Sequence, residues 1–175
     1  PWLNYDDTVT AVAVHEGITH ICDSAFTYMG KLTSVTLPDS LVSAGAGVFS
    51  GCGALESIRL PASLKHIPKS MLSLTGLRAV TIPEGVLSIG EAAFTNCSNL
   101  TELNMYYLVT EGTNHYDMLL PTDVYIGKDV FDGCHPDFRI VVDAQVYKMF
   151  ITDPNWSQYA DKIVASNQED LLETE

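Results

Sequence analysis

The sequence predicts an α/β solenoid: a right-handed coil of short repeats, with a parallel β-sheet along one face and short strands, 3₁₀ turns or helical turns along the other. Three observations lead to this architecture. Apolar residues return at a fixed period, a short alternating pattern opens each period, and proline or glycine marks the same positions in successive periods. Stacked units of this kind bury a continuous core that no single unit could bury alone.

The period is set by a leucine that recurs at Leu32, Leu55, Leu77 and Leu100, with separations of 23, 22 and 23 residues. Self-similarity with this spacing is typical of leucine-rich repeats. Each leucine is followed by two apolar residues at alternating positions, which predict a short strand. These pairs are Val35 and Leu37, Ile58 and Leu60, Val80 and Ile82, and Leu103 and Met105.

The repeat that begins at Leu77 shows how one unit is expected to fold. Its strand ends at Pro83, because proline lacks the N–H that a sheet ladder needs. Ile89-Gly90 predicts a tight bend, since glycine adopts backbone angles that other residues resist. Residues 90–97 then predict one helical or 3₁₀ turn on the outer side.

The whole chain fits one domain with a cap at each end. We expect residues 1–8 to be part of an N-terminal cap and residues 9–143 to form about six repeats, of which the first places Val9, Val12 and Val14 in its strand and Ile18 in the core. Residues 144–166 predict a helical C-terminal cap, because Trp156, Tyr159 and Ile163 have helical spacing. Residues 167–175 form an acidic tail.

The fifth repeat carries an insertion of 14 residues, within about 106–122, directly after its strand. Connecting loops are free to vary at such a point. The segment holds Tyr106, Tyr107 and Tyr116, and aromatic residues often dominate the energetics of interfaces. Two roles are open for it: a binding edge beside the sheet, or a plug that covers the sheet or the core.

The outward residues of successive strands form the candidate binding surface, because solenoids commonly bind through this face. Apart from the tyrosines of the insertion, it is poor in aromatic side chains. The residues that we predict to contact a partner, on the face and in the insertion, are Ser34, Thr36, Ser57, Arg59, Thr81, Glu102, Asn104, Tyr106, Tyr107 and Tyr116.

The charge of the chain argues against several functions. With 22 acidic and 9 basic residues, the formal net charge is −13, which disfavours binding to nucleic acid or anionic lipid. No apolar run approaches the roughly 20 residues of a membrane span. The histidines and aspartates are scattered, and no nucleotide-binding, hydrolase or metalloprotease motif occurs. We therefore predict a protein that is not an enzyme and has no catalytic residues, cofactor or metal.

The cysteines are expected to pack in the core as free thiols. We place the one-residue deletion of the third repeat between Leu72 and Leu74, so that Leu74 aligns with Cys52, Cys97 and Cys134. An apolar residue at that position favours packing over chemistry. A disulfide between Cys97 and Cys134 is the less favoured alternative, and a metal site is the least favoured.

The repeat pattern resembles the BspA-type, or Treponema-type, leucine-rich repeats of bacterial surface proteins. The segments that carry the resemblance are LTSVTLPDSL, LRAVTIPEGVLSIGEAAFTNCSNL and IGKDVFDGC. The resemblance implies a secreted or cell-surface module that binds proteins and mediates adhesion. Its partner would be a host extracellular matrix protein or another surface protein, with a glycan less favoured, and we expect a monomer. The alternative is a structural spacer or stalk that presents other domains.

Overall fold

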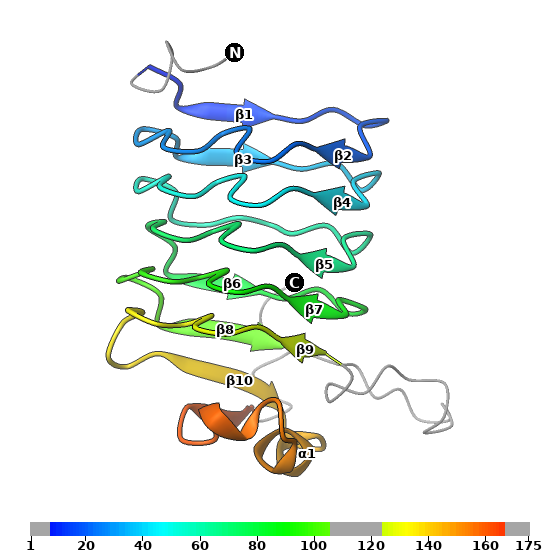
Figure 1. Cartoon of the computed structure of the whole chain (residues 1–175), viewed down its shortest axis with the longest axis vertical. Helices are drawn as coiled ribbons and strands as arrows, with labels where there is room; N and C mark the ends of the chain where they lie inside the picture. Colours follow the sequence, from blue (N-terminus) through cyan, green and yellow to red (C-terminus); the bar gives the residue numbers. More distant parts are fainter. Residues whose placement is uncertain (1–7, 106–123, 167–175) are drawn as a thin grey trace.

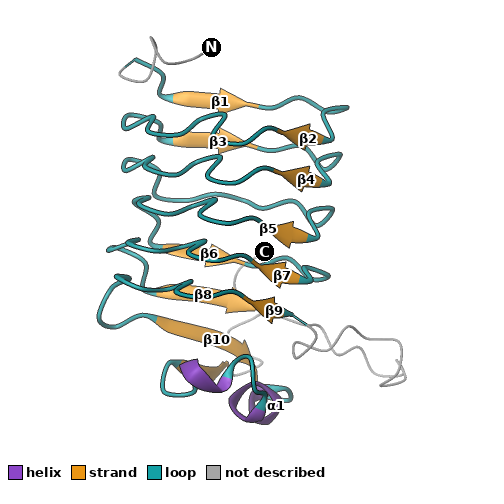
Figure 2. Cartoon of the chain, in the orientation of Figure 1, coloured by secondary structure: helices purple, strands orange, loops and turns teal. Residues whose placement is uncertain are grey.

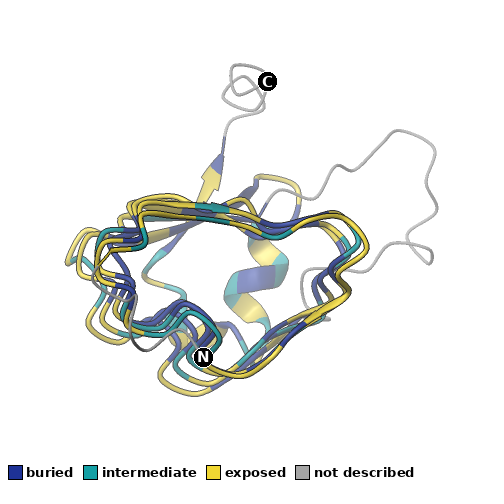
Figure 3. Cartoon of the chain, turned by 90° about the horizontal axis from the view of Figure 1, so that it is seen from above, coloured by how far each residue is buried: buried dark blue, intermediate teal, exposed yellow. Residues whose placement is uncertain are grey.

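The computed structural model describes residues 8–105 and 124–166. Successive repeats lie one above another along the long axis, so that the chain forms a regular coil (Figure 1). Seen along that axis, the repeats follow one closed outline (Figure 3). Each repeat contributes to three sides, which we call the strand face, the second sheet and the turn face.

The strand face carries the longer strands, and all its pairings are parallel (Figure 2). β1 pairs with β3, whereas β6, β8, β10 and β11 form a separate sheet. Residues 57–60 of the third repeat form no strand, so the expected sheet is present but interrupted. The strands are β1 (Ala11–Ala13), β3 (Ser34–Thr36), β6 (Ala79–Thr81), β8 (Glu102–Met105), β10 (Arg139–Asp143) and β11 (Ile163–Ser166).

The second sheet consists of two-residue strands and is also divided. β2 pairs with β4, and β5, β7 and β9 form a separate group. Ile67 pairs with Ile89, and Ile89 pairs with Ile126, which is the equivalence expected across the insertion. These strands are β2 (His20–Ile21), β4 (Ser43–Ala44), β5 (His66–Ile67), β7 (Ser88–Ile89) and β9 (Tyr125–Ile126).

The turn face is joined by main-chain hydrogen bonds throughout the stack. The N–H of each donor reaches a carbonyl one repeat further on. The pairs include Phe26 to Val48, Phe49 to Met71, Leu72 to Ala93 and Phe94 to Val130.

Within residues 90–97, residues 91–96 form turns, and the helical or 3₁₀ turn expected there is absent. Ala92 and Asn96 have φ values of 55° and 60°. Left-handed residues cannot continue a right-handed helix, so these positions break the segment into turns. Positive φ recurs at the same two positions in the other repeats, at Ser24 and Tyr28, Gly47 and Gly51, and Ser70 and Leu74, and also at Asp129 and Gly133.

Ile89-Gly90 ends a short strand, and the tight bend predicted there is wrong. Gly90 lies outside the left-handed region, so its conformation does not require glycine. Space does. A Cβ on Gly90 would lie 2.6 Å from the backbone nitrogen of Lys69, and one on Gly127 would lie 2.5 Å from that of Glu91. Glycine here allows the backbones of neighbouring repeats to approach closely.

The expected register of the third repeat is wrong by one residue. Leu74 is 45% exposed and has φ of 57°, so it matches Gly51 and not Cys52. The buried Thr75 occupies the cysteine position instead. The deletion therefore falls between Thr75 and Leu77. Pattern matching failed because a leucine was taken to be inward, whereas the backbone turn points it outward.

The C-terminal cap is helical only in part. α1 (Tyr147–Thr152) is followed by a 3₁₀ turn at Ser157–Tyr159, and the chain then returns to the sheet as β11. Ile163 belongs to β11 and pairs with Ile140, so its helical spacing from Trp156 was misleading. Trp156 is fully buried and donates its indole N–H to the Val124 carbonyl at 3.1 Å.

One continuous apolar cluster runs through the described repeats and the cap. Aromatic rings stack between neighbouring repeats: Phe26 on Phe49 at 5.5 Å, and Phe94 on Phe131 at 5.9 Å between centroids. The first repeat is looser than expected, because Ile18 is 46% exposed instead of buried. Residues 1–8 and 167–175, predicted as a cap and a tail, lie outside the described residues except for Thr8.

Candidate binding face

We call the part of the strand face from β1 to β6 the upper strand face, and the part formed by β8 and β10 the lower strand face. The predicted contact residues of the upper strand face lie side by side and are accessible. Ser34 and Thr36 project from β3, and Thr81 projects from β6. Ser57 and Arg59 lie between them on the strand-free segment of the third repeat, and all five are exposed. Their neighbours Ala11, Ala13 and Ala79 are exposed too, so this part of the face is built from small side chains around one arginine.

The lower strand face is less accessible than the sequence suggested. Glu102 is half-buried, and Asn104, although it alternates with the inward Leu103, is only 9% exposed. Val141 and Asp143 of β10 are buried as well. Period-two alternation predicts the direction of a side chain and cannot predict what covers it. Tyr106, Tyr107 and Tyr116 lie outside the described residues, and so does the insertion.

The strand ladder is open on both sides of the third repeat. Among the described residues, no backbone hydrogen bond joins residues 57–60 to β3 or β6; the nearest is from the Arg78 N–H to the Glu56 carbonyl. Along a parallel strand, alternate residues bond to opposite neighbours. Because β6 is paired only with β8, half of its main-chain groups face the open side.

A cleft of about 510 Å³ lies at this opening, between the third repeat and β6. Its size is within the range of small ligand-binding clefts. Ile58, Leu60 and Val80 are buried side chains that line it, and Arg59 and Glu84 carry opposite charges at its exposed margin. The other lining residues are Ala62, Ala79, Thr81 and Pro83.

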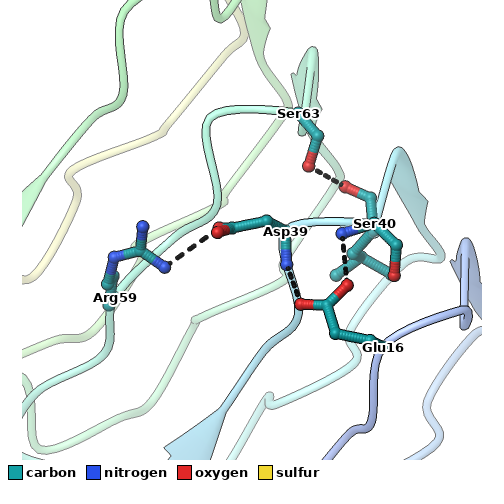
Figure 4. Close-up of polar contacts among 6 residues, drawn as sticks. Glu16, Asp39, Ser40, Arg59 and Ser63 are labelled. Atoms are coloured by element: carbon teal, nitrogen blue, oxygen red, sulfur yellow. Dashed lines mark hydrogen bonds and ion pairs between the residues drawn. The ribbon is translucent and has the colours of Figure 1, made fainter.

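Polar side chains connect the first three repeats beside the cleft (Figure 4). The Glu16 carboxylate accepts hydrogen bonds from the Asp39 and Ser40 N–H groups, at 2.9 and 3.3 Å. Asp39 in turn pairs with Arg59 at 3.1 Å, and Ser63 donates to the Leu41 carbonyl at 2.6 Å. The Arg59 and Asp39 side chains are 73% and 71% exposed, so their ion pair contributes little to stability.

The sequence reasoning missed two features of the surface. It did not identify Pro68 as the residue at the position of Gly45, Gly90 and Gly127. The sequence shows this equivalence, because Pro68 follows Ile67 as Gly90 follows Ile89. The sequence reasoning also gave no role to the position shared by His20 and His66, which forms a column of polar side chains on the second sheet. There, His20 and His66 hydrogen-bond to Ser43 and Ser88 at 2.8 Å. Tyr125, 60% exposed, continues this column.

The four cysteines are free, but Cys22 is exposed and Cys134 is half-buried, so the expectation that the cysteines pack in the core is met only by Cys52 and Cys97. Cys52 and Cys97 are buried, and their thiols donate to the carbonyls of Phe26 and Leu72. Burial raises the pKa of Cys52 to about 11 and that of Cys134 to about 12, and it also raises the pKa of Cys97. Within residues 8–105 and 124–166, no group of three or more His, Cys, Asp or Glu could hold a metal ion.

Comparison with known proteins assigns the repeats. The sequence profile described as "BspA type Leucine rich repeat region" matches in six copies over residues 4–116. The chain belongs to this family. The resemblance noted from the sequence is thus confirmed. No functionally curated protein matches the BspA-type chain.

Solved structures show the same solenoid fold. A leucine-rich cell surface protein of Faecalibacterium prausnitzii matches with a TM-score of 0.64 and 24% identity, covering 91% of this chain and 36% of its own. The T. pallidum leucine-rich repeat protein matches at 0.61 and 24% identity, covering 78% and 59%. The pneumococcal vaccine antigen PcpA matches at 0.62 and 17% identity, covering 91% and 42%. This BspA-type chain therefore spans less than two thirds of each. None of the helices in the described residues has the length and the hydropathy that a membrane span requires.

Proposed function

We propose that the chain is an extracellular, cell-surface module that binds a protein partner through its strand face, with no catalytic activity of its own. The cleft beside β6 is the observation that supports this proposal most. It lies within the accessible part of the face, between the third repeat and β6, and its apolar floor is bordered by exposed polar groups. An apolar centre with a polar rim is the usual anatomy of a protein interface.

The chemistry of the cleft fits a polypeptide better than a glycan. Main-chain groups of β6 are unpaired on this side and can bond to an extended peptide, as open sheet edges do in strand addition. The described residues that line the cleft offer no aromatic side chain against which a sugar ring could stack. Among the described large hydrophobic side chains, the exposed aromatic residues are Tyr28 and Tyr125, and both lie on the other two sides of the solenoid. The fold is shared with a protein described as a cell surface protein, which supports an extracellular setting.

A binding screen tests the proposal. The chain would be immobilised and exposed to a panel of purified extracellular matrix proteins, mucins, bacterial surface proteins and glycans. Three arginine variants then locate the contact. Ala79→Arg fills the cleft, Ala11→Arg changes the strand face away from it, and Ala46→Arg changes an exposed position off that face.

We expect a protein ligand whose affinity falls at least about tenfold with Ala79→Arg and is unchanged with Ala46→Arg. If Ala11→Arg lowers the affinity as well, the contact with the ligand extends along the strand face. Equal binding by all three variants contradicts binding through the strand face. A variant that lacks residues 107–119 asks separately whether the insertion takes part. If no panel member binds, the spacer hypothesis is favoured.

A further inference from the structure

Two of the junctions between neighbouring repeats are joined by main-chain bonds on all three sides. Between the first and second repeats, β1 pairs with β3, β2 pairs with β4, and the turn face adds bonds such as Phe26 N–H to the Val48 carbonyl. The fourth and fifth repeats are joined in the same way, through β6 with β8, β7 with β9, and the turn face. Three lines of hydrogen bonds hold such repeats parallel and prevent rocking.

The junction between the second repeat (residues 32–54) and the third (55–76) is different. On the strand face and on the second sheet, no backbone hydrogen bond joins them. Three bonds on the turn face remain, from Gly47, Phe49 and Gly51 to Lys69, Met71 and Ser73. Apart from the local turn bond from Leu55 to Cys52, where the chain passes from one repeat to the next, all described main-chain bonds across this junction therefore lie along one edge of the solenoid.

Pro68 accounts for the opening of the second sheet. In the other repeats, the N–H of Gly45, Gly90 and Gly127 donates to the preceding repeat, at 2.7–2.8 Å. Pro68 has no N–H to donate to Ala44. It also carries a Cβ where the other repeats need glycine for close approach, as Gly90 and Gly127 show. A missing donor and an added side chain both keep β4 and β5 apart.

Side-chain hydrogen bonds also cross this junction: the Ser50 and Ser73 hydroxyls lie 2.8 Å apart on the turn face, and the Ser63 hydroxyl donates to the Leu41 carbonyl at 2.6 Å. The Arg59–Asp39 pair is exposed on both sides, and exposed pairs are easily broken. The apolar core, however, is continuous through both repeats. Complete separation would expose that core, whereas a small rotation about the turn face would break no main-chain bond.

We infer that the second and third repeats meet at a built-in hinge, whose axis is the turn face and whose opening separates residues 57–60 from β3 on the strand face. Rotation about this axis moves the strand faces of the two parts relative to each other and leaves the turn face unchanged. The hinge follows from the backbone connections alone and holds whether or not the cleft binds a partner.

Spin-label distances test the hinge directly. In a Cys22→Ser background, one labelled pair, Ala13→Cys with Val164→Cys, spans the strand face. A second pair, Asp23→Cys with Lys128→Cys, runs along the edge of the turn face; all four positions are exposed. Pulsed electron paramagnetic resonance should give a distance distribution at least about twice as wide for the first pair as for the second. Equal widths would overturn the hinge.

Substitutions of Pro68 supply the matched test. Pro68→Gly restores the N–H and removes the Cβ, so β4 and β5 can pair and the strand-face distribution should narrow to the width of the turn-face pair. Pro68→Ala restores the N–H but keeps the Cβ, and we expect it to stay broad. If the strand-face distance distribution narrows with both variants, the result also supports the hinge and assigns it to the N–H that Pro68 lacks. An unchanged width with Pro68→Gly would overturn the role of this residue and the inference with it.

Hydrogen exchange provides a second measurement on the unaltered chain. Amides of residues 57–60 should exchange at least about tenfold faster than those of residues 102–105, while Phe49 stays protected on the hinge axis. Protection of residues 57–60 equal to that of residues 102–105 would contradict the inference.

Discussion

The third and fourth repeats have equivalent cores but different backbone connections. Leu72 and Phe94 occupy the same position and are both fully buried, and Leu64 and Val86 are buried in the same way. The fourth repeat is bonded to the fifth on all three sides, whereas the third is bonded to the second on one. Burial of a repeat and its connection to its neighbours are therefore separate properties.

The difference arises because core positions tolerate substitution and close backbone contacts do not. Many apolar residues can fill an inward position if the volume is right. A ladder of main-chain bonds needs an N–H at every rung, and here it also needs glycine at the point of closest approach. One residue, Pro68, changes both conditions at once.

The largest expected effect tests whether the two cores are truly equivalent. Phe94→Ala should reduce the free energy of unfolding by about 3–5 kcal/mol, and Leu72→Ala by about 2–5 kcal/mol, because both side chains are fully buried. Chemical denaturation measures both. Since the cost depends on how far the site can collapse, the looser third repeat should give a value near the lower end of its range. A near-neutral result for Phe94→Ala would refute the repeat register.

A smaller effect tests the close approach between repeats. Gly90→Ala should destabilise the protein by about 1–3 kcal/mol, because the new Cβ would overlap the backbone at Lys69 and Pro68. Gly53→Ala is the matched control, since nothing lies within 4 Å of its Cβ position. Removing glycine flexibility there should be neutral or stabilising by about 0.4–1 kcal/mol. Equal losses in the two variants would mean that space is not the reason for glycine at position 90.

A stabilising change is expected at Leu74, where the third repeat departs from its neighbours. Leu74→Gly should raise the free energy of unfolding by about 0.5–1 kcal/mol, because the left-handed conformation costs other residues about 1–2 kcal/mol and part of that gain is offset by glycine's flexibility. Thermal denaturation can follow the change. Leu74→Ala removes the exposed side chain but keeps the strain, so it should not reproduce the gain. Stabilisation by alanine alone would point to the exposed leucine instead.

The smallest effect concerns the position shared by Cys52, Thr75 and Cys97. Cys52→Thr should change stability by less than about 1 kcal/mol, because a threonine already fills this position in the third repeat. The Thr75 hydroxyl donates to the Leu72 carbonyl of its own repeat at 2.8 Å, and a threonine at position 52 would exchange the bond of the thiol to the preceding repeat for a bond of this kind. Cys52→Val has a similar volume and no donor, so it should cost about 1 kcal/mol more. Identical denaturation midpoints for threonine and valine would show that the position needs volume only.

Part of the architecture could be predicted because it depends on periodic burial. The inward positions Leu32, Leu55, Leu77 and Leu100 are all fully buried, and the pairing of Ile89 with Ile126 follows from the same register. Errors arose where backbone conformation decides the outcome. Leu74 looks apolar and inward, but its positive φ turns it outward. Ile163 has helical spacing, but an open sheet edge at β10 recruits it as a strand.

The candidate site was predicted less well than the fold. Arg59 and Thr81 were identified as outward residues and do line the cleft, but the cleft itself was not foreseen. It depends on a missing ladder between two repeats, which no single repeat reveals. The buried Asn104 shows the opposite error, because its outward register says nothing about its accessibility.

By itself, the sequence determined the period, the inward residues and the family, since each depends on apolar spacing that recurs along the chain. Only the tertiary structure decided which repeats bond to their neighbours, where the strand face opens and which outward residues remain accessible. The physical reason is that burial is a property of one residue in one repeat. Main-chain pairing is a property of two repeats at contact distance, and a single proline can prevent it.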